Sequence, residues 1–169
     1  PPATARKSLQ VRVVGLRREI GDVLLTRGDA YLVRLEPHQL DLQRFEQLLS
    51  DATHALGHGD PSAAVATLDE ALRLWRGPPL ADFTYESFAQ AAIARLEELR
   101  LHAHELRIEA QLELALHARV IAELEGLVAA HPLRERLRAQ LMLALYRAGR
   151  QAEALQAYQA ARRELAEEL

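Results

Sequence analysis

The chain has 169 residues, of which 49% are hydrophobic and 27% charged, so it can build a buried core. It contains no cysteine, no long apolar run and no secretory signal pattern, which argues against a disulfide scaffold and membrane insertion and favours a cytoplasmic protein. The net charge of −3 conceals an asymmetry. Residues 1–36 hold seven basic and four acidic side chains, whereas 37–169 hold fourteen and twenty. Only the first segment has the charge that nucleic acid attracts.

The first segment begins with the pattern of a basic amphipathic helix. Leu9, Val13, Leu16 and Ile20 recur at spacings of four, three and four, which places them on one helical face. Gly21 is expected to end this helix, so the pattern predicts a helix over residues 8–20. The opposite face is expected to carry the cations Lys7, Arg12, Arg17 and Arg18.

A hairpin is predicted directly after this helix. Two β-branched or aromatic runs, at 23–26 and 31–35, flank the sequence Arg27-Gly28-Asp29-Ala30, which favours a turn with Arg27 at its tip. A basic helix followed by a hairpin is the order in which a winged helix presents its DNA-reading parts. The alternative interpretation is a solvated basic helix capped by a hairpin.

Residues 9–18 together with 26–31 resemble the recognition helix and wing of the OmpR/PhoB-type output domain of bacterial response regulators. The resemblance implies a helix in the major groove and a wing arginine on phosphate or in the minor groove. Gly15 departs from the family, which usually has a polar or basic residue there. Because only 1–6 precede the helix, we interpret 1–36 as the truncated, C-terminal part of a winged-helix domain. The DNA-binding residues implied are Lys7, Arg12, Arg17, Arg18 and Arg27.

The rest of the chain, 37–169, shows no strand-like alternation, and its capping residues, glycines and prolines divide it into helices. Asp41 can cap a helix that runs to about Leu56, and Asp60-Pro61 can start the next, which runs to Trp75. A long apolar period then extends from Phe88 to Leu114. Further helices are expected up to residue 130, over 133–148, and from 151 to the end.

An internal period organises these helices. The intervals between Gly149, Ala154, Tyr158 and Ala161 recur at Gly59, Ala64, Leu68 and Ala71. A third segment fits as well, because Val120, Leu124 and Leu127 lie 34 residues before Ala154, Tyr158 and Ala161. Thirty-four residues is the period of tetratricopeptide repeats. The alternative is that alanine- and leucine-rich helices produce such matches by chance. We therefore predict a mainly α fold, a tetratricopeptide-like α-helical repeat array with an N-terminal recognition helix and β-hairpin wing.

Residues 37–169 resemble the bacterial transcriptional activation domain of the actinomycete antibiotic regulatory proteins, the AfsR/SARP type. The resemblance rests on the stretches 74–82, 94–100, 131–137 and 149–155. It implies a DNA-binding transcriptional activator that acts on promoter DNA, with a helical domain for self-association as a homodimer or for contact with RNA polymerase. Since that family usually continues further, the chain is expected to be cut at both ends. The alternative is a protein-interaction scaffold that does not bind DNA.

Nothing in the sequence predicts an enzyme, a cofactor or a metal site. The chain has no phosphate-binding glycine loop with a lysine, no nucleophile elbow and no cysteine nucleophile. His54 and His58 have a spacing that can bind metal, but the glycines on both sides of His58 predict a loop at that residue, which favours a solvated pair. The seven histidines are His38, His54, His58, His102, His104, His117 and His131.

Overall fold

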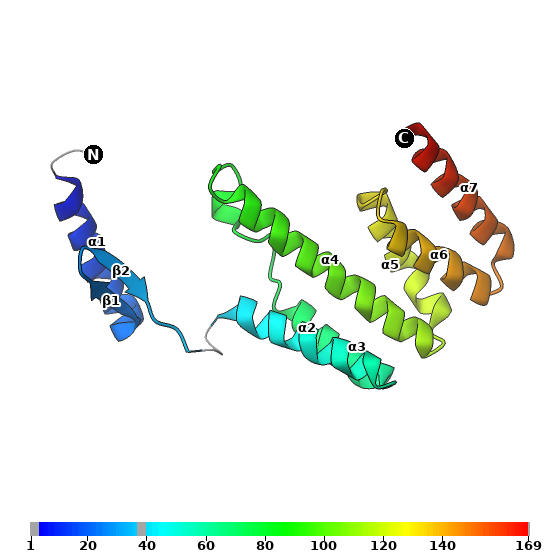
Figure 1. Cartoon of the computed structure of the whole chain (residues 1–169), viewed down its shortest axis with the longest axis horizontal. Coiled ribbons are helices and arrows are strands. Elements are labelled where there is room, and N and C mark those ends of the chain that lie inside the picture. Colours follow the sequence, from blue (N-terminus) through cyan, green and yellow to red (C-terminus); the bar gives the residue numbers. More distant parts are fainter. Residues whose placement is uncertain (1–3, 37–39, 169) are drawn as a thin grey trace. The chain divides into compact units, whose positions relative to one another are not determined.

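The computed structural model describes residues 4–36 and 40–168, so His38 lies outside the described residues. The chain divides into two compact units, 1–44 and 45–169, and Figure 1 shows their elements. In the first unit these are α1 (Ala5–Ile20), η1 (Gly21–Val23), β1 (Leu24–Arg27) and β2 (Ala30–Val33). In the second they are α2 (Asp41–Gly57), whose first turn falls in unit one, α3 (Pro61–Arg73), η2 (Ala81–Phe83), α4 (Gln90–Glu113), α5 (His117–Ala130), α6 (Glu135–Arg147) and α7 (Gln151–Glu168).

The first unit is the predicted helix followed by an antiparallel hairpin. Gly21, with φ of 70°, ends α1, and its N–H donates to the carbonyl of Arg17. The prediction that Arg27 lies at the hairpin tip is wrong, because Arg27 is the last residue of β1 and pairs with Ala30. The turn consists of Gly28 and Asp29, and Gly28 has φ of 60°, a conformation that glycine adopts without strain.

The apolar stripe of α1 is only partly covered by the hairpin. Val13 is buried, as is Leu24 of β1, but Leu9, Leu16 and Ile20 are each about half exposed. Each aliphatic side chain contributes about 1.5–3 kcal/mol when fully buried, so the described part of this unit has a small core.

In the second unit, most helices begin and end close to the residues predicted from the sequence. Asp60 is the N-cap of α3, its carboxylate accepts from the N–H of Ala63 at 3.0 Å, and Pro61 is the first helical residue. Three boundaries differ by two residues. The helix α3 ends at Arg73 rather than Trp75, Phe88 lies before α4 and is exposed, and α6 begins at Glu135 rather than at residue 133.

Two apolar clusters form the core, and α4 contributes to both. One joins Phe45 and Leu49 of α2, Leu68 of α3 and Leu106 of α4. Trp75 packs against this cluster with its ring edge-on to Phe45, at 5.3 Å between centroids, as expected for a core anchor. The other cluster joins α4 to α5, α6 and α7 through residues that include Ile108, Leu112, Leu124, Leu137, Leu141 and Ala154. In Figure 1, α4 is the long helix of this unit, with α2 and α3 on one side and α5 and α6 on the other.

The structure confirms the predicted repeat fold and shows where the repeats differ. Ala64, Ala71, Ala154 and Ala161 are buried, as close helix contacts require. Leu68 and Leu124 occupy the same repeat position and are 0% exposed, whereas their counterpart Tyr158 is 51% exposed. Among the described residues α6 is the main packing partner of α7, so the position that is buried in the earlier repeats remains open in the last one.

A buried carboxylate fixes α4 against the start of α6. Glu105 is fully buried. Arg134, the residue before α6, donates to both oxygens of its carboxylate, with Nε at 2.6 Å from Oε1 and Nη2 at 3.3 Å from Oε2. This hydrogen bond is the main reason that the pKa of Arg134 is raised, so its guanidinium stays charged. The Gln140 side chain donates to the backbone carbonyl of Glu105 at 2.9 Å.

A second ion cluster connects three helices. Arg107 of α4 donates to Asp69 of α3 at 3.0 Å and to both carboxylate oxygens of Glu123 of α5 at 2.5 Å. His104 Nδ1 lies 2.9 Å from Glu123 Oε1. Burial acts to raise the pKa of Glu123, but the contacts with His104 and Arg107 outweigh it and hold that pKa below its usual value.

This depressed pKa predicts an acid-sensitive contribution to stability. The Glu123 carboxylate stabilises the fold above its ordinary pKa of 4.5, and that contribution is lost as the pH falls through the lower folded value. Glu123→Gln should lower the free energy of unfolding by roughly 1.5–3 kcal/mol at pH 7. Urea unfolding at a series of acidic pH values should show that the difference in free energy of unfolding between the variant and the wild type shrinks below the ordinary pKa of glutamate. The exposed Glu125→Gln serves as control, and a gap independent of pH would contradict the assignment.

Candidate nucleic-acid interface

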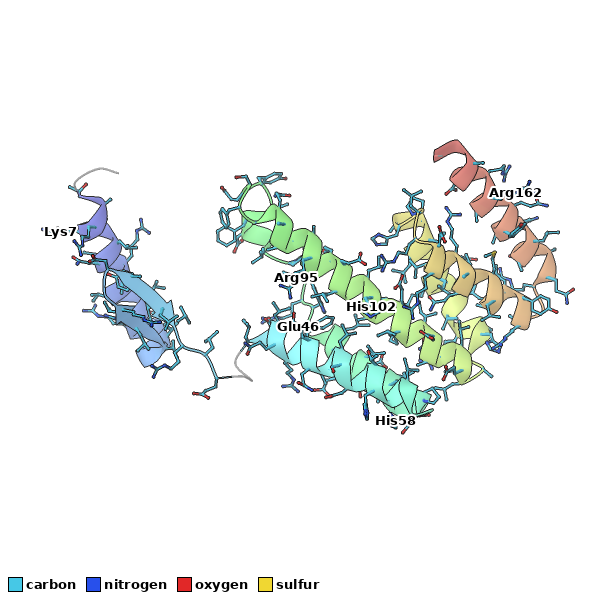
Figure 2. The ribbon with its side chains drawn as sticks, viewed as in Figure 1. Lys7, Glu46, His58, Arg95, His102 and Arg162 are labelled. Carbon is cyan, nitrogen blue, oxygen red and sulfur yellow. The ribbon has the colours of Figure 1, made fainter. Side chains whose placement is uncertain are left out.

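One stripe of α1 combines two cations with two exposed valines. Lys7, Val11, Val14 and Arg18 follow each other at spacings of four, three and four, so they lie on one side of the helix. Val11 is 66% exposed, and both cations are exposed. In Figure 2, Lys7 projects from the N-terminal half of α1. The two cations were predicted from the sequence but the valines were not, although the same spacing contained them.

Two more of the cations predicted from the sequence are exposed but lie outside this stripe. Arg12 is exposed on the flank of α1, and Arg27 is exposed at the end of β1, next to the turn. The side chains of Lys7, Arg12, Arg18 and Arg27 enter no ion pair or hydrogen bond with residues 4–36 or 40–168. Four cations are therefore available to an anionic partner.

Arg17 differs from these four because its side chain is used within the unit. Its Nε donates to the carbonyl of Leu24 at 2.8 Å, and its Nη2 donates to the Thr26 hydroxyl at 2.7 Å. The residue is half-buried. The fork of the guanidinium thus holds β1 against α1. Sequence spacing alone could not show this, because the helical wheel does not reveal which flank the hairpin covers.

A second arginine also connects the helix to the hairpin. Arg6 forms an ion pair with Asp29 in the turn, although both side chains are largely exposed. Such an exposed pair contributes little to stability. It nevertheless places the turn near the N-terminal end of α1, on which Lys7 also lies. Arg6 was not among the residues predicted from the sequence.

The described parts of the chain contain neither a cluster of metal ligands nor a membrane-spanning helix. Across 4–36 and 40–168, no three histidine, aspartate or glutamate side chains gather as metal ligands would. The rings of His54 and His58 lie with their centroids 4.0 Å apart and their planes tilted by 32°, and His58 Nδ1 lies 2.8 Å from the carbonyl of His54. None of the described helices is long and apolar enough to cross a membrane.

Shallow grooves run between neighbouring helices of the second unit. One of about 570 Å³ lies between α2 and α4, near the ion pair of Glu46 and Arg95, which Figure 2 labels. Another of about 350 Å³ lies between α4 and α6. Its lining includes Leu112 and Leu143 together with charged side chains. These surfaces are open and mixed in polarity, which suits a protein ligand better than a small molecule.

The model of the bacterial transcriptional activator domain family matches residues 40–169. The chain belongs to this family. Its activator domain therefore comprises the helical repeat from α2 to α7, and the resemblance seen in the sequence is confirmed. The match begins one residue before α2 and includes both ion clusters described above.

Relatives of this activator-domain protein are named as regulators of transcription. The regulatory protein AfsR of Streptomyces griseus is 43% identical over 100% of this chain and 17% of its own length. The regulatory protein DnrI of Streptomyces peucetius is 38% identical over 100% of this chain and 66% of its own length. A solved structure of Mycobacterium tuberculosis EmbR in complex with a low-affinity phosphopeptide matches with a TM-score of 0.93 and 35% identity, over 100% of this chain and 46% of EmbR. The chain thus spans only part of each relative.

Proposed function

We propose that this chain is part of a DNA-binding transcriptional activator. Residues 1–36 serve as the C-terminal part of a winged helix, and 37–169 serve as its activation domain. The observation that carries the proposal is the exposed stripe of Lys7, Val11, Val14 and Arg18 on a helix that is followed by a hairpin. The similarity of AfsR, DnrI and EmbR over the whole chain, including 1–36, supports it.

Each exposed side chain has a role in this proposal. Lys7, Arg12 and Arg18 neutralise phosphates along the major groove, and Arg27 does so from the wing. Val11 and Val14 lie between the cations, where aliphatic groups can contact thymine methyls. Arg17 holds the hairpin against the helix, and so it acts on DNA binding by positioning Arg27.

The helical unit is proposed to act through proteins. Its net charge is opposite in sign to that of 1–36, so it does not attract DNA. Self-association and contact with RNA polymerase are the two partner classes that we propose for it. The open grooves between its helices support a second candidate function, a protein-interaction scaffold that does not bind DNA.

A salt titration tests the DNA-binding proposal. In the full-length protein that carries this sequence, the double variant Lys7→Ala, Arg18→Ala should bind duplex DNA more weakly. The slope of log K against log salt should become shallower by about 0.9 for each phosphate that the variant no longer neutralises. Fluorescence anisotropy with a labelled duplex measures both quantities. Arg17→Ala should weaken binding and make the slope shallower by no more than about 0.9, because only the phosphate contact of Arg27 depends on the position of the hairpin.

The matched control removes two cations from the helical unit. Arg119 and Arg147 are exposed, so the double variant Arg119→Ala, Arg147→Ala changes the net charge by the same amount as the test variant. Equal reductions of affinity and slope in the test and control variants would refute the assignment of the α1 stripe. Absence of any DNA binding by the wild type would leave the scaffold as the function.

A further inference from the structure

The segment between α3 and α4 exposes a concentration of large apolar side chains. Tyr85 is 99% exposed and Phe88 is 72% exposed, and Phe83 and Leu80 are each more than 40% exposed. Two of the three phenylalanines of the chain and one of its four tyrosines therefore lie within six residues. Figure 1 shows this segment as an open loop at the N-terminal end of α4. A contiguous apolar patch on a protein surface marks an interaction site.

Local hydrogen bonds hold this segment in a defined shape. The Phe83 N–H donates to the carbonyl of Leu80 at 2.8 Å, and the Thr84 hydroxyl donates to the carbonyl of Ala81 at 2.8 Å. The side chain of Gln90, the first residue of α4, donates to the carbonyl of Thr84 at 2.7 Å. The loop is thus preorganised, and a partner that binds it does not need to order it first.

The backbone of Leu80 and the rings of Phe83 and Phe88 also have a defined arrangement in this segment. Leu80 has φ of 51° and ψ of 40°, the left-handed conformation that residues with a side chain rarely adopt. The rings of Phe83 and Phe88 lie 5.7 Å apart between centroids and so form a single apolar surface. A strained residue that supports an exposed aromatic pair is typical of a functional loop rather than of a simple connection.

The charges of the segment restrict the kind of partner. Between residues 77 and 94 the only charged side chains are those of Asp82 and Glu86, and both are exposed. An acidic aromatic surface repels nucleic acid and is complementary to a protein cleft with an apolar floor and a rim of lysine or arginine. Aromatic side chains are also the ones that most often dominate the energy of protein interfaces.

We propose that residues 80–88 are a docking surface that inserts Phe83, Tyr85 and Phe88 into an apolar, basic-rimmed cleft of a partner protein. This inference rests on the proposed function, because it identifies the surface through which the activator contacts a component of the transcription machinery. Asp82 and Glu86 align the loop with the rim of the cleft, and the rings supply the buried area.

Binding to purified RNA polymerase holoenzyme tests this surface. In the full-length protein, the double variant Tyr85→Ser, Phe88→Ser should bind the holoenzyme at least about tenfold more weakly, as expected when interface anchors are removed. The variant Asp82→Lys, Glu86→Lys should also bind more weakly, and wild-type affinity should fall as salt rises. Biolayer interferometry measures these affinities.

Two exposed aromatic residues elsewhere in the helical unit provide a matched control. Tyr146 on α6 and Tyr158 on α7 are 62% and 51% exposed, so Tyr146→Ser, Tyr158→Ser removes a similar aromatic surface and should leave binding unchanged. The proposal would be overturned if both double variants weakened binding equally or if the loop variant bound as tightly as the wild type. It would also be overturned if the wild type did not bind the holoenzyme at a concentration of about 10 µM. A lowered melting temperature of the loop variant would do the same, because the rings would then serve the fold.

The same variants separate this inference from the proposed function. The loop variants should retain the DNA affinity and the salt slope of the wild type, since residues 80–88 lie outside the α1 stripe. Loss of holoenzyme binding with DNA binding intact supports the docking surface. Full holoenzyme binding by the loop variants refutes the docking surface without affecting the DNA-binding proposal, which the Lys7 and Arg18 variants test independently.

Discussion

Leu124→Ala should lower the free energy of unfolding by about 2–5 kcal/mol. Leu124 is 0% exposed in the cluster that joins α4 to α5, α6 and α7, and truncation leaves a cavity that the packed helices can fill only in part. Urea unfolding followed by circular dichroism at 222 nm measures the change. Because Leu124 lies near the middle of the repeat array, the whole helical unit should be destabilised.

The internal control for this variant is Tyr158→Ala. Tyr158 occupies the same repeat position as Leu124 but is 51% exposed, so its truncation should cost less than about 1 kcal/mol. The two substitutions therefore test whether burial or repeat position determines the effect. Equal destabilisation would show that α7 is covered in solution by a surface outside the described residues.

Glu105→Ala should destabilise the helical unit by about 1.5–3 kcal/mol, the contribution of hydrogen bonds to charged groups, because it removes the buried carboxylate that Arg134 binds. The substitution leaves the guanidinium of Arg134 without its bidentate acceptor at the point where α6 begins. Alanine has a higher helix propensity than glutamate, so the destabilisation cannot come from α4 itself. Thermal and urea unfolding should both detect it.

Glu98→Ala is the matched control, because Glu98 binds the same arginine from the surface. Its Oε1 lies 2.7 Å from Arg134 Nη1, but its side chain is 57% exposed. An exposed pair of this kind contributes about 0–1 kcal/mol. If Glu98→Ala and Glu105→Ala had the same effect, burial of the Glu105 carboxylate would not matter to the stability of the fold.

Much of the fold could be predicted from the sequence because its helices begin and end at residues with a physical reason to be there. Asp60-Pro61 starts α3 and Gly21 ends α1 as predicted. The errors lie where local chemistry gives two answers. Arg27 belongs to a strand because Gly28 and Asp29 suffice for the turn, and Phe88 fits the helical period of α4 without belonging to that helix.

The candidate site was less predictable, because side-chain partners depend on tertiary packing. Arg17 belongs by spacing to the basic surface of α1, yet it binds Leu24 and Thr26 of the hairpin. Glu105 had a signal in the sequence that was missed. It falls between Leu101 and Ile108 on the apolar face of α4, where a carboxylate indicates a buried partner. Identifying Arg134 as that partner required the structure.

The membership of α4 in both apolar clusters has a consequence for how the helical unit responds to binding. A stack of repeats that touch only their neighbours can fray from either end, with each pair opening by itself. Here one continuous 24-residue helix contributes side chains to both cores, so neither core can open without exposing part of the other. Docking at the loop before α4 would therefore act on a helix whose side chains belong to both cores.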